Sequence, residues 1–225
     1  MSEKSTNKYA IVDLEATSAS STACIIQVGI VIMQNGRVID EFASDVNPHQ
    51  KLDNHIVHLT GITDQQLSQA PDFSEIARTI FELIEDCIFV AHNVKFDANL
   101  LAEALFMEGF ELRTPRVDTV ELAQVFYPTL EQYNLSYLSR VLNLDLAQAH
   151  TAIEDARATG KLLLHLMDKI ASLPRQTIDM LLTFSDNLLF ESELVIRDAI
   201  KGKTNSLSKE YIMLEESGIV LRRPL

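Results

Sequence analysis

Apolar residues fall in short runs over the first half of the chain, and this pattern indicates β-strands. Five such runs occur, at about 8–14, 24–34, 37–46, 87–91 and 116–117. Asn35-Gly36 separates the second run from the third. Because Asn-Gly is the strongest two-residue hairpin signal, the first three runs predict an antiparallel meander.

Between and after these runs, apolar residues recur at helical spacing. The predicted helices cover about 73–86, 94–108, 118–126, 134–142 and 151–172. The alternation of elements predicts an α/β fold, with a mixed five-stranded sheet flanked by helices. Beyond Pro174 the pattern changes, so we predict a first domain over 1–174 and a mostly helical extension or linker over 175–225.

Two acidic residues stand at the end of the first predicted strand. Asp13 and Glu15 are two residues apart in YAIVDLEAT, so their side chains point to the same face of the strand. Two buried like charges are costly unless a cation or a proton compensates them. This pair therefore favours a divalent metal ion.

A third acid faces inward from the predicted helix 94–108, in the segment AHNVKFDANLL. Asn93 is the expected N-cap, and Asp97 lies three and four residues before Leu100 and Leu101 of the apolar stripe. The spacing places Asp97 on the buried side of the helix, where a carboxylate again favours a metal.

The segment AHTAIEDARAT supplies a histidine and a fourth acid. Thr151 followed three residues later by Glu154 predicts a helix with Thr151 as its N-cap. His150 and Asp155 then occupy the two positions that a hydrophobic staple brings into contact. Asp155 can join a metal cluster, while His150 stays close enough to take a proton from the attacking water.

The motifs DLEAT, HNVKFD and HTAIEDA, in this order, resemble those of DnaQ-type (DEDDh) 3′→5′ exonucleases of the ribonuclease H-like superfamily. The resemblance covers roughly residues 7–172, and IIQVGIVIM and VHLTGIT resemble further family segments. It implies a ribonuclease H-like sheet and a metal-dependent hydrolase that releases nucleoside 5′-monophosphates from single-stranded DNA, with RNA possible. The catalytic residues that it implies are Asp13, Glu15, Asp97, His150 and Asp155.

The same resemblance implies the cofactors and the substrate contacts. Asp13, Glu15, Asp97 and Asp155 would hold two divalent cations, Mg²⁺ or Mn²⁺, roughly 3.5 to 4 Å apart. The expected contacts to the terminal nucleotides are Leu14, Ala16, Thr17, His58, Asn93 and Phe96. For Phe96, core packing on the helix is an equally good interpretation.

The segment DTVELAQVFYP and the helical extension are similar to the front portion of DinG-type nuclease-helicases of Gram-positive bacteria. This similarity implies a covalently linked helicase domain as a partner, and no helicase motif occurs in this sequence.

The net charge of the chain is −13, which is unusual for a protein that binds a polyanion. It predicts weak binding of DNA ends unless a basic neighbour contributes.

The distribution of apolar residues also bears on where the protein is located. The sequence has no apolar run of about 18 residues that could span a membrane, and its N-terminal segment MSEKSTNK lacks the apolar stretch of a secretion signal. We therefore expect a cytoplasmic protein with no membrane partner.

Two alternatives to the exonuclease of a nuclease-helicase stay open. One is a free-standing exonuclease that trims RNA or acts as a proofreading subunit, and the other is a non-catalytic nucleic-acid-binding module, which would not need all five catalytic residues.

Overall fold

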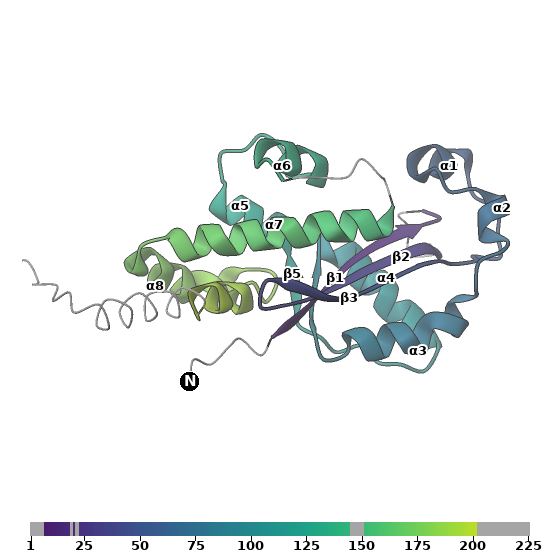
Figure 1. Cartoon of the computed structure of the whole chain (residues 1–225), viewed down its shortest axis with the longest axis horizontal. Helices are drawn as coiled ribbons and strands as arrows, with labels where there is room; N and C mark the ends of the chain where they lie inside the picture. The colour runs from purple at the N-terminus through teal and green to yellow at the C-terminus, as the bar shows by residue number, and fades with distance from the viewer. Residues whose placement is uncertain (1–6, 19, 21–22, 145–150, 202–225) are drawn as a thin grey trace, which may run out of the picture.

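A five-stranded sheet forms the centre of the computed structural model, which describes residues 7–201 except 19, 21–22 and 145–150 (Figure 1). The strands are β1 (Lys8–Ala16), β2 (Ile25–Gln34), β3 (Arg37–Asp45), β4 (Ile88–Ala91) and β5 (Arg116–Asp118). They lie in the order β3-β2-β1-β4-β5. β1, β2 and β3 pair antiparallel, while β4 and β5 run parallel to β1. The predicted meander and the mixed sheet are confirmed.

Helices cover both faces of this sheet. In chain order they are α1 (Asn54–Thr60), α2 (Asp64–Leu67), α3 (Phe73–Ile84), α4 (Val94–Met107), α5 (Thr119–Phe126), α6 (Leu135–Val141), α7 (Ala152–Ser172) and α8 (Arg175–Phe184). A 3₁₀ turn, η1 (Ser185–Asn187), follows α8. The long helix α7 runs along one face, and α3 lies on the other side of the sheet in Figure 1.

Alternate side chains of β1 belong to two separate hydrophobic cores, one on each face of the sheet. Ile11 packs with residues of α5, α6 and α7 on one face, whereas Ala10 and Val12 pack with α3 and α4 on the other. Both faces of β1 are therefore buried, which explains why its sequence is a nearly unbroken apolar run. The two acids of this strand, Asp13 and Glu15, both stand at its carboxyl end, and that end is the predicted site.

The short helices α1 and α2 were not predicted. They enclose a small third core of Ile26, Leu52, Ile62 and Leu67. Neither helix is long enough to show a clear apolar periodicity, so tertiary packing rather than local sequence determines them. α1 carries His58, one of the predicted substrate contacts, on an exposed surface.

The described part of the extension is helical and packs against the sheet. Residues 193–201 are helical, and the buried side chains of Ile178, Val195 and Ile196 belong to the same core as Ile11. The hydroxyl of Tyr9 on β1 donates a 2.7 Å hydrogen bond to Asp198. Over 175–201 these contacts favour a helical extension over a linker, and the domain boundary at residue 174 stays a prediction.

Candidate metal centre

β1 places two acids side by side at the carboxyl end of the strand. Asp13 stands opposite Gly29 of β2, and Glu15 stands opposite Gln27. Leu14, between them, points to the other face and is buried. The two carboxylates therefore share one face, and both are only partly exposed.

α4 brings Asp97 to the same place from the other side of β1. Asp97 is 5% exposed, which confirms the inward position that the helical spacing predicts. Its Oδ1 accepts a 3.0 Å hydrogen bond from the backbone N–H of Leu14, the residue between the two acids of β1. This bond ties the first turns of α4 to the strand that carries Asp13 and Glu15.

α7 supplies Asp155, because its first turn lies directly on β2. Gly29 makes this approach possible, since a Cβ at that position would lie 2.2 Å from the carbonyl carbon of Ala152. The backbone N–H of Ala152 donates a 2.8 Å hydrogen bond to the side chain of Gln27. Thr151 is the N-cap of the helix, as predicted, and accepts from the N–H of Glu154. The contacts bring ligand atoms of Asp13, Glu15 and Asp155 within 4.8 Å of one another.

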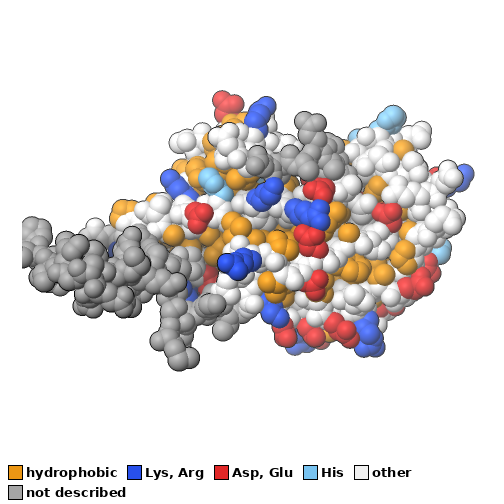
Figure 2. Space-filling view, viewed as in Figure 1, with side chains coloured by type: hydrophobic (Ala, Val, Ile, Leu, Met, Phe, Trp, Pro, Cys, Tyr) orange, Lys and Arg blue, Asp and Glu red, His pale blue; other side chains and the backbone are white. Residues whose placement is uncertain are grey.

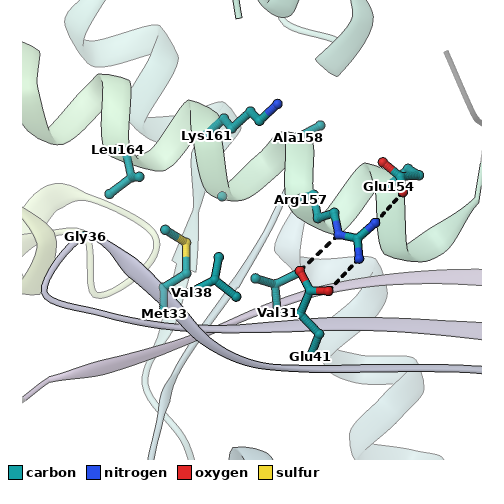
Figure 3. A pocket seen from close by; sticks show the side chains of 11 residues that line it. Val31, Met33, Gly36, Val38, Glu41, Glu154, Arg157, Ala158, Lys161 and Leu164 are labelled. Atoms are coloured by element: carbon teal, nitrogen blue, oxygen red, sulfur yellow. Dashed lines mark hydrogen bonds and ion pairs between the residues drawn. The ribbon is translucent and has the colours of Figure 1, made fainter. Parts of the chain in front are cut away.

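A charged clamp holds α7 on the edge of the sheet, nearly two turns beyond the N-cap. The guanidinium of Arg157 pairs with Glu41 of β3, at 3.0 Å from its Nε, and with Glu154 of its own helix (Figure 3). This pairing holds the pKa of Glu41 below its ordinary value. Beside the clamp lies a hollow of about 280 Å³ between β2, β3 and α7. Figure 3 shows the mostly apolar side chains that line it, among them Met33, Val38 and Leu164.

Burial and neighbouring charges raise the pKa values of two of the four acids. Burial, and then the charges of Asp97, Asp155 and Glu15, raise the pKa of Asp13 well above its ordinary value. Burial also raises the pKa of Asp97 to about 8, although the N–H groups bonded to its carboxylate partly oppose the shift. A cluster of this kind needs either protons or a cation near neutral pH.

The donor set fits a hard divalent cation. Carboxylate oxygens are the ligands that Mg²⁺ and Mn²⁺ prefer. Asp13 and Glu15 of β1 and Asp155 of α7 offer them, and neither histidine nor cysteine is among the described members of this group. A bound dication would also compensate the buried negative charges whose burial and repulsion raise the two pKa values. Asp97 completes the set on geometry and electrostatics, although it lies outside the tightest group of three.

Several of the predicted substrate residues are sequence neighbours of the acids of this centre. Ala16 and Leu14 are buried parts of β1, and Thr17 closes the loop that follows, because its hydroxyl accepts a 3.0 Å bond from Cys24 N–H. Phe96 is half-buried on α4, and Asn93 is exposed just before that helix. Asn93 precedes α4 as expected, but its side chain makes no capping hydrogen bond. The predicted contacts of these residues with nucleotides stay predictions.

His150, the predicted general base, lies outside the described residues, directly before Thr151. Three other histidines lie on the surface or bond to neighbouring side chains. His49 pairs with Asp72 at 2.7 Å, His55 is exposed, and His165 bonds to the hydroxyl of Tyr127.

Gly29 and Gln27 are the site-building residues that sequence reasoning missed. The available signal was a glycine inside an otherwise apolar strand, which indicates close approach of another backbone. Which backbone approaches could not be deduced, because α7 begins more than one hundred residues later in the chain.

Comparisons with known proteins agree with this architecture. The RNase_T family, described as exonucleases, matches residues 10–163. The 3′-5′ exonuclease DinG of Staphylococcus aureus strain USA300 is 35% identical over 211 residues, which make up 92% of this chain. That similarity has to include most of residues 175–225, which lie beyond the family match. The chain spans about a quarter (24%) of the length of this relative.

Several solved structures share the fold at low sequence identity. Exonuclease I is 17% identical, with a TM-score of 0.66 over 79% of this chain and 44% of that one. The nuclease domain of 3′hExo, a DEDDh family member bound to rAMP, is 16% identical, with a TM-score of 0.62 over 72% of this chain and 92% of that one. Exonuclease X, in complex with 5′ overhanging duplex DNA, is 20% identical, with a TM-score of 0.59 over 71% of this chain and 91% of that one. The predicted ribonuclease H-like fold is thereby confirmed.

Proposed function

Because this chain belongs to the RNase_T family of exonucleases, we propose that it removes nucleotides one at a time from the 3′ end of single-stranded DNA and releases nucleoside 5′-monophosphates. The observation that carries the proposal is the convergence of Asp13, Glu15 and Asp155 within 4.8 Å, with Asp97 bonded to the strand between them. A module that only binds nucleic acid would have no use for this costly cluster.

The four acids would hold two divalent ions, Mg²⁺ or Mn²⁺. When bound, such a pair activates water and neutralises charge on the phosphate that is cleaved. The charges of all three other acids act on Asp13, which supports a place for its carboxylate at the centre of the set. The N–H of Leu14 holds the Asp97 carboxylate in one orientation.

His150 would act as the general base that takes the proton of the attacking water. In the sequence it directly precedes Thr151, the N-cap of α7, and Asp155 follows one turn into the helix, which is the spacing of a hydrophobic staple. The anchors of α7 on β2 set the position of Asp155.

Substrate contacts would come from the loop after β1 and from two neighbouring helices. Thr17 and the backbone of Ala16 lie next to Glu15, where a terminal nucleotide would be held. His58 on α1 and Phe96 on α4 offer ring faces on which bases could stack. Stacking on aromatic rings does not depend on the base sequence of the DNA, which suits an enzyme that degrades any strand.

The negative net charge of the chain favours contacts with only a few nucleotides at the end of the substrate strand. With a net charge of −13, few cations can release counterions from a long strand. On the face in Figure 2, lysine and arginine side chains stand among acidic ones rather than in one basic track. We propose that tight binding is supplied by a covalently linked helicase domain, of the kind implied by the resemblance to DinG-type proteins.

The proposal takes DNA rather than RNA as the substrate, and it places the protein in the cytoplasm. The most similar relatives named above are exonucleases of the DinG kind, and exonuclease I is solved in complex with a dA16 oligonucleotide. In the part of the chain that the structure describes, no helix has the length and hydrophobicity needed to cross a bilayer.

A labelled strand tests the polarity and the metal requirement together. A single strand with a 5′ label should give a ladder that shortens from the 3′ end with Mg²⁺ or Mn²⁺, and EDTA should stop the reaction. The matching RNA strand should be degraded more slowly. Cleavage that persists in chelator, or immediate release of the 5′-labelled nucleotide, would overturn the proposal.

A further inference from the structure

The chain makes an unusual turn where β4 ends and α4 begins. Asn93 has φ 75° and ψ 56°, in the left-handed region that residues other than glycine rarely adopt. Such a conformation costs on the order of 1 kcal/mol or more and persists only when neighbouring contacts hold it. The turn sets the direction of α4, and Asp97 lies in the first turn of this helix.

The carboxylate of Asp118 holds this turn. Its Oδ1 accepts the backbone N–H of Asn93 at 3.0 Å and the N–H of Val120 at 2.8 Å. The second bond caps α5, so one oxygen atom joins the starts of α4 and α5. Asp118 is 6% exposed and lies beside Ala91 in the parallel pair of β4 and β5. A carboxylate so far from water is stable here because it accepts both N–H groups.

His92 fixes the same junction through its ring. The Nε2 atom lies 2.7 Å from the carbonyl oxygen of Tyr133, which can only accept, so Nε2 carries a hydrogen. Burial lowers the pKa of His92, and the neutral ring then accepts at Nδ1 from the hydroxyl of Thr119, 2.8 Å away. That hydroxyl also lies 3.2 Å from the carbonyl oxygen of Ala91. The ring is thereby held at both ends in one tautomer.

We propose that Asp118 and His92 are positioning residues, which fix the start of α4 so that the Asp97 carboxylate meets Asp13, Glu15 and Asp155. This inference rests on the function proposed above, in which Asp97 is a metal ligand. The two residues do not contact the metal or the DNA. They act through the direction of the helix and through the 3.0 Å bond from Leu14 to Asp97.

Two substitutions at Asp118 separate positioning from charge. Asp118→Ala removes both hydrogen bonds, and Mn²⁺ affinity, measured by calorimetric titration, should fall about 10- to 100-fold, as it does when partners of metal ligands are lost. Asp118→Asn keeps the Oδ1 acceptor and removes only the charge, so affinity should return to within a few fold of wild type. At saturating Mn²⁺ the KM for single-stranded DNA should be unchanged in both, and kcat should be lowered in Asp118→Ala alone.

Asp72→Ala is the matched control. It removes an aspartate that caps α3 in a capping box and that pairs with His49 on the surface. The control should lower the melting temperature while Mn²⁺ affinity stays at the wild-type value. If Asp118→Ala behaves like this control, with lower stability and unchanged metal affinity, the role is structural only and the inference is wrong.

Thr119→Val decides the matter if Asp118→Ala does not fold. It keeps the shape of the fully buried side chain and removes the hydroxyl between His92 and Ala91. A loss of several fold in Mn²⁺ affinity is expected, and an unchanged affinity would contradict the inference. Failure of the proposed function looks different, because wild-type protein would then bind no Mn²⁺ and cleave no DNA.

Discussion

Gly29→Ala should disable the site although Gly29 is not one of its acids. The added Cβ would lie 2.2 Å from the carbonyl carbon of Ala152 and 2.3 Å from the backbone nitrogen of Ile153. Both atoms belong to the backbone at the start of α7, so no side-chain rotation can relieve the overlap. Strand β2 or the first turn of α7 has to move.

The size of the movement follows from the contact distances. Ordinary Cβ contacts begin at about 3.4 Å, so the two backbones have to separate by about 1 Å. Overpacking of this kind costs about 1–3 kcal/mol of folding free energy, and occasionally more. A displacement of about 1 Å at a catalytic group can lower the rate roughly 10²-fold. Asp155 sits one turn beyond the contact and moves with the helix.

Initial rates on a labelled single strand and Mn²⁺ titrations of the folded variant would measure this effect. Gly160→Ala is the matched control, because its Cβ meets the flexible sulfur end of Met33 at 3.0 Å and alanine favours a helix more than glycine does. The control should keep its rate and metal affinity. A Gly29→Ala protein with wild-type stability, Mn²⁺ affinity and rate would refute the account of how Asp155 is placed.

Three further predictions concern charge and hydrogen bonding. Without metal, the raised pKa values of Asp13 and Asp97 mean that the folded state binds more protons than the unfolded one. The free energy of unfolding should therefore fall as the pH rises from about 4 to about 8, and Mn²⁺ should reverse the loss in urea melts; a metal-free stability that rises with pH would contradict this. His150→Ala should keep Mn²⁺ affinity and lower kcat roughly 10²- to 10⁴-fold in single-turnover assays, and an unchanged kcat would exclude it as the base. Tyr9→Phe removes a donor to the buried carboxylate of Asp198 and should cost about 1–3 kcal/mol in urea melts without changing kcat, whereas unchanged stability would mean that the extension does not anchor β1 there.

The apolar pattern of the sequence identified the helices and strands that are long enough to show a full apolar period. α7 is predicted to within one residue, because Thr151 marks its start and an apolar stripe continues to its end. The inward position of Asp97 follows from the same reasoning. Short helices such as α1 have too few residues to show a period, so the sequence did not reveal them.

Contacts between distant segments could not be read from local pattern. The N–H of Asn93 bonds to Asp118, 25 residues away, and the helix start looked like an ordinary side-chain cap. The position of Val195 in the same core as Ile11 is likewise fixed by tertiary packing, and the sequence alone left residues 175–225 as an extension or a linker. The identity of the four acids was predictable, whereas the residues that hold them in place were not.

The central claim is that the four acids hold two catalytic metal ions, and a Mn²⁺ titration followed by electron paramagnetic resonance tests it most directly. The wild-type chain should bind two Mn²⁺ ions whose spins are coupled, because the four acids would hold both ions close together, and Asp13→Ala should lose the coupled signal together with nearly all of its exonuclease rate. Wild-type protein that binds no Mn²⁺, or an Asp13→Ala variant that keeps two coupled ions, would contradict the claim.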